Sequence, residues 1–317
     1  AKCIASVDVL FAFGRLASRY SWAMPSWNEN RRYSVVDGRH PVIEYSLPEG
    51  EYYVPNDVEL NSSKEQILLI TGPNMSGKSA LLRQTALISI LAQMGSFVPA
   101  KSANLTILDR LFVRVGASDN LSAGESTFMV EMSETASILN GLTERSLVLL
   151  DEIGRGTATY DGLSIAQSIT EYLHFHPFKP LTLFATHYHE LVSLEESCER
   201  VSNKHVSVLE DNGDIVFLRK LKPGGSNHSF GIHVARMAGM PQTVVLRAKD
   251  LLKELEQLHG HKPEKSNDNG ANHQMTLVQW ESPEVESLKK ELEELDINAI
   301  APIDALLLIQ RWKSLFK

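Results

Sequence analysis

Residues 72–79 constrain the fold of this chain most strongly, because they match the pattern G-x-x-x-x-G-K-[ST]. The stretch consists of Gly72, Pro73, Asn74, Met75, Ser76, Gly77, Lys78 and Ser79. Residues 67–70 before it form a continuous apolar run, which is typical of a strand buried on both faces. Apolar residues after it recur at helical spacing as far as Gly95. The sequence therefore predicts a strand, a glycine-bounded turn and a helix.

Such a turn gathers backbone N–H groups and the positive end of a helix around one point, which suits a polyphosphate. In this interpretation Lys78 contacts the β- and γ-phosphates, and Ser79 offers its hydroxyl to Mg²⁺. The alternative is a chance match in an ordinary glycine-containing turn. The pattern of strands and helices in the rest of the chain argues against that alternative.

Two more short apolar runs end in polar residues with useful chemistry. They are residues 147–150, followed by Asp151 and Glu152, and residues 182–185, followed by Thr186 and His187. Ligands of open α/β sheets bind beyond the carboxyl ends of strands. We therefore expect these polar groups to share one crevice with residues 72–79.

The chemistry that these groups predict is ATP hydrolysis with Mg²⁺. Asp151 would hold the metal, Glu152 would orient or deprotonate the attacking water, and His187 would contact the γ-phosphate or that water. Each has a structural alternative, as a helix cap, a surface acid and a strand-end histidine respectively, but their joint placement favours catalysis. Residues 187–190 read H-Y-H-E, which lacks the H-E-x-x-H spacing of a helical zinc site, so no zinc is predicted.

Strands and helices alternate along the chain, which predicts an α/β fold with a mostly parallel sheet and helices on both faces. Residues 2–20 are expected to form an amphipathic helix, residues 22–32 a connection and residues 38–41 a turn. A strand with a turn at Asp109 and Arg110 is expected over residues 105–115. Helical character is expected over residues 127–142.

Two residues outside the strand ends are candidates for nucleotide contacts. Tyr53 lies before the glycine-bounded turn and could stack on an adenine, although strand aromatics are more often part of a core. Ser126 ends a small polar cluster, residues 122–126, directly before the helix at 127–142. From the residues alone, Ser126 is more simply read as an N-cap.

Composition excludes several classes of protein. The net charge of −8 and the lack of a basic cluster argue against a free-standing duplex binder. The sequence has neither an apolar window long enough to span a membrane nor a signal peptide, so a cytoplasmic protein is expected. Cys3 and Cys198 cannot form a disulfide framework. The first residue is not Met and the chain opens within a helical pattern, so we expect a piece of a longer protein.

Several stretches together resemble the ATPase domain of the MutS mismatch-repair family, a branch of the ABC-type ATPases. They are TGPNMSGKS (71–79), STFMVEM (126–132), LDEIGRGT (150–157), TYDG (159–162), FATHYHEL (184–191) and FGIHVARMAGMP (230–241). They fall in the family's order over most of residues 38–258. The resemblance implies a P-loop ATPase of the ABC type that uses ATP and Mg²⁺.

The resemblance also implies roles for particular residues. Ser126 would reach the γ-phosphate bound by a partner subunit, Asn74 would lie near the phosphates, and Tyr53 would be the aromatic adenine contact. Residues 230–241 would form the helix-turn-helix that buries a homodimer interface. Ser76 and Ala80 depart from the Gly and Thr of many members, which alters the flexibility of the loop and the start of the helix.

Four segments are predicted. Residues 1–37 are the end of a preceding helical region and a connection, and residues 38–258 form the ATPase domain with its helix-turn-helix dimer element. Residues 259–273 form a flexible linker, and residues 274–317 a helical oligomerisation tail that could build a tetramer. Within the tail, Gln274 to Leu277 resemble a sliding-clamp peptide, although a chance match is equally good. Mismatched duplex DNA would be read by other parts of the parent protein, and a MutL-type protein is a further expected partner.

Two rival functions remain open from the sequence. The first is another ABC ATPase, such as a transporter motor or a chromosome-organising ATPase. The second is a dimerisation and docking module whose nucleotide is only structural. Lys78, Asp151 and Glu152 are all present, which argues against the second rival.

Overall fold

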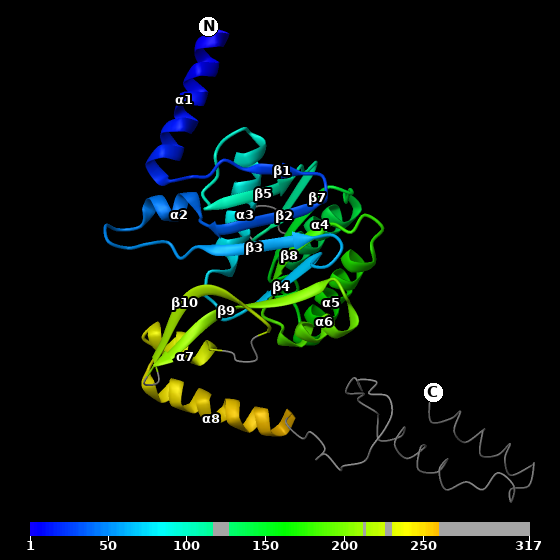
Figure 1. The fold of residues 1–317 in the computed structure, drawn as a ribbon. Coiled ribbons are helices and arrows are strands. Elements are labelled where there is room, and N and C mark those ends of the chain that lie inside the picture. The colour runs from blue at the N-terminus through cyan, green and yellow to red at the C-terminus, as the bar shows by residue number, and fades with distance from the viewer. Residues whose placement is uncertain (117–126, 212–213, 226–229, 260–317) are drawn as a thin grey trace, which may run out of the picture. The chain divides into compact units, whose positions relative to one another are not determined.

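The computed structural model describes residues 1–116, 127–211, 214–225 and 230–259 (Figure 1). The chain divides into two units, Ala1–Gln257 and Leu258–Lys317. The described helices and strands lie in the first unit, apart from the last two residues of the final helix. The predicted linker and tail, with Gln274 to Leu277, lie outside the described residues.

The larger sheet has six strands in the order β10-β9-β4-β8-β7-β6. The strands are β4 (Ile67–Thr71), β6 (Arg110–Arg114), β7 (Ser146–Asp151), β8 (Leu181–Ala185), β9 (Val201–Asp211) and β10 (Asp214–Pro223). All neighbouring pairs are parallel except β9 and β10, which form an antiparallel hairpin. The prediction of a mostly parallel sheet is therefore confirmed.

Helices cover both faces of this sheet, as predicted. On one face, Leu68 and Ile70 of β4 belong to a core cluster with α3 (Lys78–Gln93). On the other face, Ile67 and Leu69 share a cluster with α4 (Thr127–Asn140) and α5 (Thr159–Phe175). Successive strand residues point to opposite faces, so a strand covered on both sides is expected to be largely apolar. Every residue of β4 and β8 is buried accordingly.

A second sheet of four strands was not predicted. Its order is β1-β5-β2-β3, formed by β1 (Ser26–Asn28), β2 (Arg32–Gly38), β3 (Asn56–Asn61) and β5 (Ser102–Thr106). Buried residues alternate along β3 with exposed or half-buried ones, since one face of the strand meets the core and the other meets solvent. Buried residues of β2, β3 and β5 join the same core cluster as α3.

The expectation of one strand with a turn at Asp109 and Arg110 over residues 105–115 is wrong in part: the strand is interrupted at residues 107–109, close to the expected turn, but the two sides are separate strands. The segment divides into β5 of the small sheet and β6 of the large sheet, so one apolar stretch serves two sheets. Between them, the Leu108 N–H donates to Gln93 Oε1 at 2.6 Å. That contact is made to the end of α3, which the local sequence pattern does not reveal.

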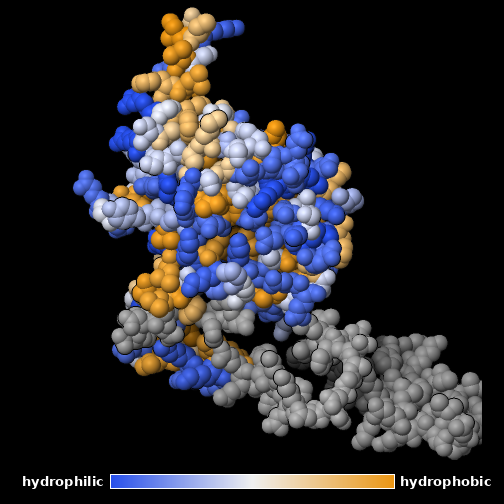
Figure 2. Space-filling model, in the orientation of Figure 1, coloured by the Kyte–Doolittle hydropathy of each residue, from blue (hydrophilic) through white to orange (hydrophobic). Residues whose placement is uncertain are grey.

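The remaining described helices lie before β3, between β8 and β9, and after β10. They are α1 (Lys2–Tyr20), α2 (Pro41–Ser46), the 3₁₀ helix η2 (His189–Ser193), α6 (Leu194–Ser197), α7 (Gly231–Met237) and α8 (Gln242–His259). The predicted first helix is confirmed as α1. It extends away from the two sheets, and many of its apolar side chains are exposed to solvent (Figures 1 and 2). The turn expected at residues 38–41 instead begins α2: His40 Nδ1 accepts the Ile43 N–H at 3.2 Å, as an N-cap does.

In the part of the chain that the structure describes, no helix combines the length and apolar character needed to cross a bilayer. The segment predicted as a helix-turn-helix, residues 230–241, contains α7 and ends directly before α8, to which residues 238–241 connect it. Its role in a dimer interface stays a prediction.

Candidate active site

The three predicted strand ends are neighbours in the large sheet. β8 lies between β4 and β7, with Ala185 registered against both Ile70 and Asp151. The connections continue past the strands: the Thr186 N–H donates to Ile70 O at 3.0 Å, and the Glu152 N–H to Ala185 O at 2.8 Å. Residues 72–79 and the polar groups after β7 and β8 therefore lie along one edge.

The loop after β4 relies on left-handed backbone. Gly72 has a φ of 144° and Gly77 a φ of 102°, conformations that glycine adopts at little cost. Met75 also has a positive φ, of 64°, and its side chain is exposed. Gly77 directly precedes α3, so the loop feeds the positive end of a helix of 16 residues.

Lys78 connects the loop to the end of β7. Its side chain is only 4% exposed, and its Nζ donates to Gly72 O at 2.7 Å and Pro73 O at 2.9 Å. The same Nζ lies 3.7 Å from Glu152 Oε1. Burial lowers the pKa of the Lys78 ammonium, while Glu152 and Asp151 act in the opposite direction.

Asp151 and Ser79 form the pair expected to hold a metal. Burial raises the pKa of the Asp151 carboxyl, and a hydrogen bond with the Ser79 side chain opposes that shift. Asp151 Oδ1 is buried and has no hydrogen-bond partner among the described residues. A buried carboxylate oxygen without a donor, beside a hydroxyl, is the kind of hard oxygen site that Mg²⁺ prefers. The donor set therefore fits the predicted metal.

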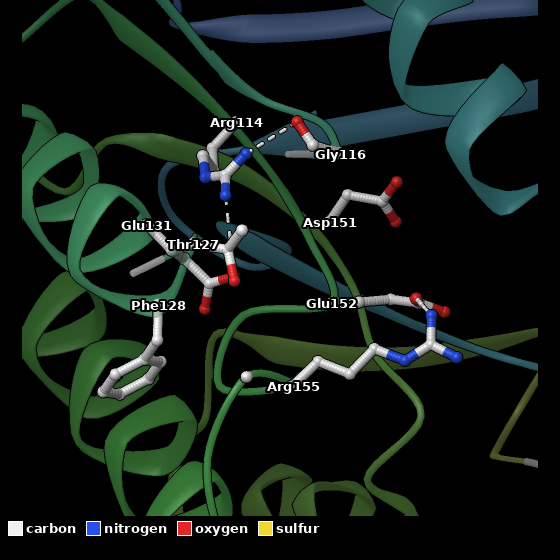
Figure 3. Close-up of a pocket in the computed structure, with 9 residues that line it drawn as sticks. Arg114, Gly116, Thr127, Phe128, Glu131, Asp151, Glu152 and Arg155 are labelled. Carbon is white, nitrogen blue, oxygen red and sulfur yellow. Dashed lines mark hydrogen bonds and ion pairs between the residues drawn. The ribbon is translucent and has the colours of Figure 1, made fainter. Parts of the chain in front are cut away.

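Glu152 adopts an unusual backbone conformation at the end of β7. Its φ is 52°, a left-handed value that costs a non-glycine residue about 1–3 kcal/mol. Its carboxylate pairs with Arg155 through Oε2 and faces Lys78 through Oε1. Figure 3 shows the Arg155 guanidinium meeting this carboxylate beside Asp151.

His187 lies half-buried after β8. Its Nδ1 is buried and has no hydrogen-bond partner in the described structure, and its ring centroid lies 4.1 Å from that of Tyr188. Burial lowers the pKa of the His187 imidazole, while the Glu152 carboxylate acts in the opposite direction. A neutral imidazole can offer a donor or an acceptor to a neighbouring group.

Two cavities flank Lys78. A cavity of about 380 Å³ is lined by Arg114, Gly116, Thr127, Phe128, Glu131, Asp151, Glu152, Arg155 and Gly156 (Figure 3). A second cavity of about 240 Å³ is lined by Gly72, Pro73, Asn74, His187, His189, Phe230, Gly231 and Val234. The Lys78 ammonium contacts Gly72 of one lining and Glu152 of the other, so it lies between them.

The comparison with known proteins agrees with this α/β fold. Residues 68–256 match the family model for MutS domain V. The chain belongs to the MutS domain V family.

Curated relatives extend the match over nearly the whole chain. It is 54% identical to the DNA mismatch repair protein MutS of Christiangramia forsetii, over 99% of the chain and 36% of the relative. The corresponding protein of Cytophaga hutchinsonii is 54% identical over 100% of the chain and 38% of its own length. That of Bacteroides thetaiotaomicron is 53% identical over 96% of the chain and 36% of its own length. The chain therefore spans little more than a third of these MutS proteins.

For this MutS domain V chain, the structure brings most of the predicted site residues to one edge of the sheet. Asn74 is exposed and lines the smaller cavity, while Ser76 is buried and its hydroxyl has no partner among the described residues. Tyr53 is half-buried, lines neither cavity and donates to Gln84 Oε1 at 3.0 Å. Burial raises its pKa to about 12. Its adenine contact stays a prediction, and Ser126 lies outside the described residues.

The sequence did not single out Arg114 or Glu131, which line the larger cavity of this MutS domain V site. Arg114 ends β6, the strand beside β7, so it obeys the same strand-end rule that identified Asp151. The sequence did not show this because residues 105–115 were interpreted as one strand with a turn at Asp109 and Arg110, so Arg114 was not assigned to the end of a strand of the large sheet. Glu131 lies within the STFMVEM motif, but the motif alone does not indicate which groups its carboxylate contacts.

Proposed function

We propose that this chain binds ATP with Mg²⁺ and hydrolyses it to ADP and phosphate, as the ATPase module of a MutS-type DNA mismatch-repair protein. The observation that carries the proposal is the cluster formed where β4 and β7 end, on either side of β8. A buried ammonium, a buried carboxylate oxygen without a partner beside a hydroxyl, and a second carboxylate lie next to one another there.

The Lys78 ammonium lies where it could bind the phosphates of a nucleotide in the loop. Its Nζ is satisfied by two carbonyl oxygens of its own loop, and phosphate oxygens entering the loop would accept those hydrogen bonds instead. Charged acceptors bind an ammonium more strongly than neutral carbonyls do. Lys78 would then hold the β- and γ-phosphates while the N–H groups at the start of α3 point at the same site.

Asp151 and Ser79 would hold Mg²⁺ through Oδ1 and the hydroxyl. When bound, that ion would neutralise phosphate charge as the bond to the γ-phosphate breaks. Binding of a cation would also give the buried Asp151 oxygen the partner that it lacks. Burial of an unpaired carboxylate oxygen otherwise disfavours its ionised form.

Glu152 would accept a proton from, or orient, the attacking water. Its carboxylate is engaged by Arg155 through one oxygen and by Lys78 through the other, and each oxygen keeps a further lone pair for a water molecule. His187 would donate to the γ-phosphate or to the same water. A positioned general base of this type contributes about 10²- to 10⁴-fold to a rate.

The relatives suggest the setting in which this activity would operate. They are named DNA mismatch repair proteins, and the chain covers little more than a third of their length. We therefore propose that ATP state in this module controls a DNA clamp, with mismatched DNA bound by the remainder of the parent protein. A homodimer through α7 and α8 would complete each site with Ser126 of the partner, and a MutL-type protein and a sliding clamp are further proposed partners.

The deciding experiment measures ATPase activity of the chain as a function of its own concentration, with and without Mg²⁺. If sites form between two chains, the rate per chain should rise with concentration and level off as dimers fill. Activity independent of concentration would contradict the shared sites, and nucleotide binding without phosphate release would favour the docking-module alternative.

A further inference from the structure

The backbone of Gly154 is held on both sides of its Cα atom. Its N–H donates to Glu131 Oε1 of α4 at 2.7 Å, and its C=O accepts from Tyr188 Oη at 2.9 Å. Gly154 has a φ of 90°, and a Cβ there would lie 2.5 Å from Gly162 O. Glycine is therefore required both for the backbone conformation and for the close approach to Gly162.

Gly154 lies two residues after Glu152, the proposed base. Glu152 is fixed by its N–H bond to Ala185 O, and Gly154 is the next backbone group with a bond to another segment. Ile153, which separates them, is fully buried. The left-handed turn at Glu152 is thus fixed before it by β8 and after it by Glu131 and Tyr188.

Arg114 in turn holds Glu131. The Arg114 side chain is 5% exposed, and its Nη2 lies 3.6 Å from Glu131 Oε2 while its Nη1 donates to Gly116 O at 2.8 Å (Figure 3). Its Nε also lies 2.9 Å from Glu134 Oε2, one turn further along α4. The guanidinium occupies one Glu131 oxygen and leaves the other for Gly154.

We propose that Glu131 is a positioning residue for ATP hydrolysis, which holds the Gly154 peptide and through it orients the Glu152 carboxylate. This inference rests on the proposed function, because it assigns Glu131 to the same reaction. The expected effect is on turnover rather than on nucleotide affinity, since Glu131 contacts neither Lys78 nor Ser79. Misplacement of a reacting group by about 1 Å costs on the order of 10²-fold in rate.

A purely structural role for Glu131 is the alternative: it could serve only to neutralise buried Arg114. Glu134 provides a matched control, because it lies on the same helix and pairs with the same guanidinium at a shorter distance. Its side chain is 53% exposed, and none of its described contacts reaches the Gly154 loop.

The test compares Glu131→Ala, Glu131→Gln and Glu134→Ala in the full chain. We expect Glu131→Ala to lower kcat about 10- to 100-fold with KM for MgATP within about two-fold. Glu131→Gln should restore most of kcat, because its amide oxygen can accept the Gly154 N–H while Glu134 still pairs Arg114. Glu134→Ala should stay within about two-fold of the unsubstituted kcat.

A second readout does not require activity. Hydrogen exchange at the Gly154 amide should accelerate in Glu131→Ala and remain slow in Glu134→Ala and Glu131→Gln. If the unsubstituted chain shows no more turnover than Lys78→Ala, the proposed function fails. The exchange measurement still decides whether Glu131 fixes the loop, and unchanged exchange in Glu131→Ala would overturn the inference.

Equal losses of kcat in Glu131→Ala and Glu134→Ala would also overturn it, as would failure of Glu131→Gln to restore activity. Tyr188→Phe keeps the test informative if Glu131→Ala does not fold. It removes the donor on the carbonyl side and leaves the ring in place, so kcat should fall by a smaller factor at unchanged KM. An unaltered kcat in Tyr188→Phe would show that the Gly154 peptide does not position Glu152.

Discussion

The two sheets of this MutS domain V chain differ in how polar groups are distributed along their strands. β4 and β8 of the large sheet are buried at every residue, and chemistry appears only where the strands end. In the small sheet, buried residues of β3 alternate with exposed or half-buried ones, so polar residues are spread along the strand. A sheet covered on both faces therefore concentrates function at its edge, whereas a half-exposed sheet mainly contributes one apolar face to the core.

The largest expected effects come from substitutions at the strand ends of the large sheet. Lys78→Ala should abolish nucleotide binding and turnover together, because the buried ammonium between the loop and Glu152 is lost. Glu152→Gln should retain binding and slow hydrolysis by about 10²- to 10³-fold, the usual scale for a positioned catalytic group. Binding of a fluorescent ATP analogue and steady-state phosphate release provide the measurements. Unchanged hydrolysis by Glu152→Gln would show that the base is assigned to the wrong residue.

A stability comparison tests the sheets themselves. Leu69→Ala in β4 removes a fully buried side chain and should lower the free energy of unfolding by about 2–5 kcal/mol. Val36→Ala in β2, where the side chain is 38% exposed, should cost less than about 1 kcal/mol. Urea unfolding followed by circular dichroism measures both. Similar losses at the two positions would contradict the contrast drawn between the sheets.

An experiment with mixed dimers tests whether the strand ends of one chain form a complete ATP site or need Ser126 of the partner chain. Lys78→Ala and Ser126→Arg should each be inactive as homodimers, and mixing them should restore about half of normal activity in each mixed dimer, because hydroxyl and helix N-terminus donors act across subunits. In such a dimer both lesions fall on one site and the other site is intact. Absence of recovery, with mixed dimers shown to form, would place Ser126 in its own chain's site.

The smallest expected effect concerns residues outside both sheets. Deletion of residues 260–317 removes no described element and should leave ATP turnover within about two-fold, because every proposed site residue lies before residue 260. The largest assembly seen by light scattering should nevertheless decrease, if the tail joins copies. A truncated chain of unchanged assembly mass and lost turnover would contradict both expectations.

The neighbouring strands β4, β8 and β7 of the large sheet could be predicted because their signals are local, whereas its hairpin of β9 and β10 was not predicted. Continuous apolar runs at β4, β7 and β8, each followed by polar residues, indicate buried parallel strands without any knowledge of their neighbours. The small sheet and the division of residues 105–115 could not be predicted in this way. Their strands are short or half-exposed, and their pairing joins segments far apart in the chain.

The candidate catalytic residues likewise divide into those that the local sequence indicates and those that only tertiary packing brings together. Lys78, Asp151 and Glu152 are evident in the sequence, because phosphate and metal chemistry requires these residue types at set distances from a glycine-bounded turn and a strand end. The residues that hold them are not evident. Glu131 and Gly154 are 23 positions apart, and Gly154 and Tyr188 are 34 positions apart. Only the packing of α4 and β8 around β7 brings their hydrogen-bonding groups within reach, because no local pattern specifies which distant donor meets which acceptor.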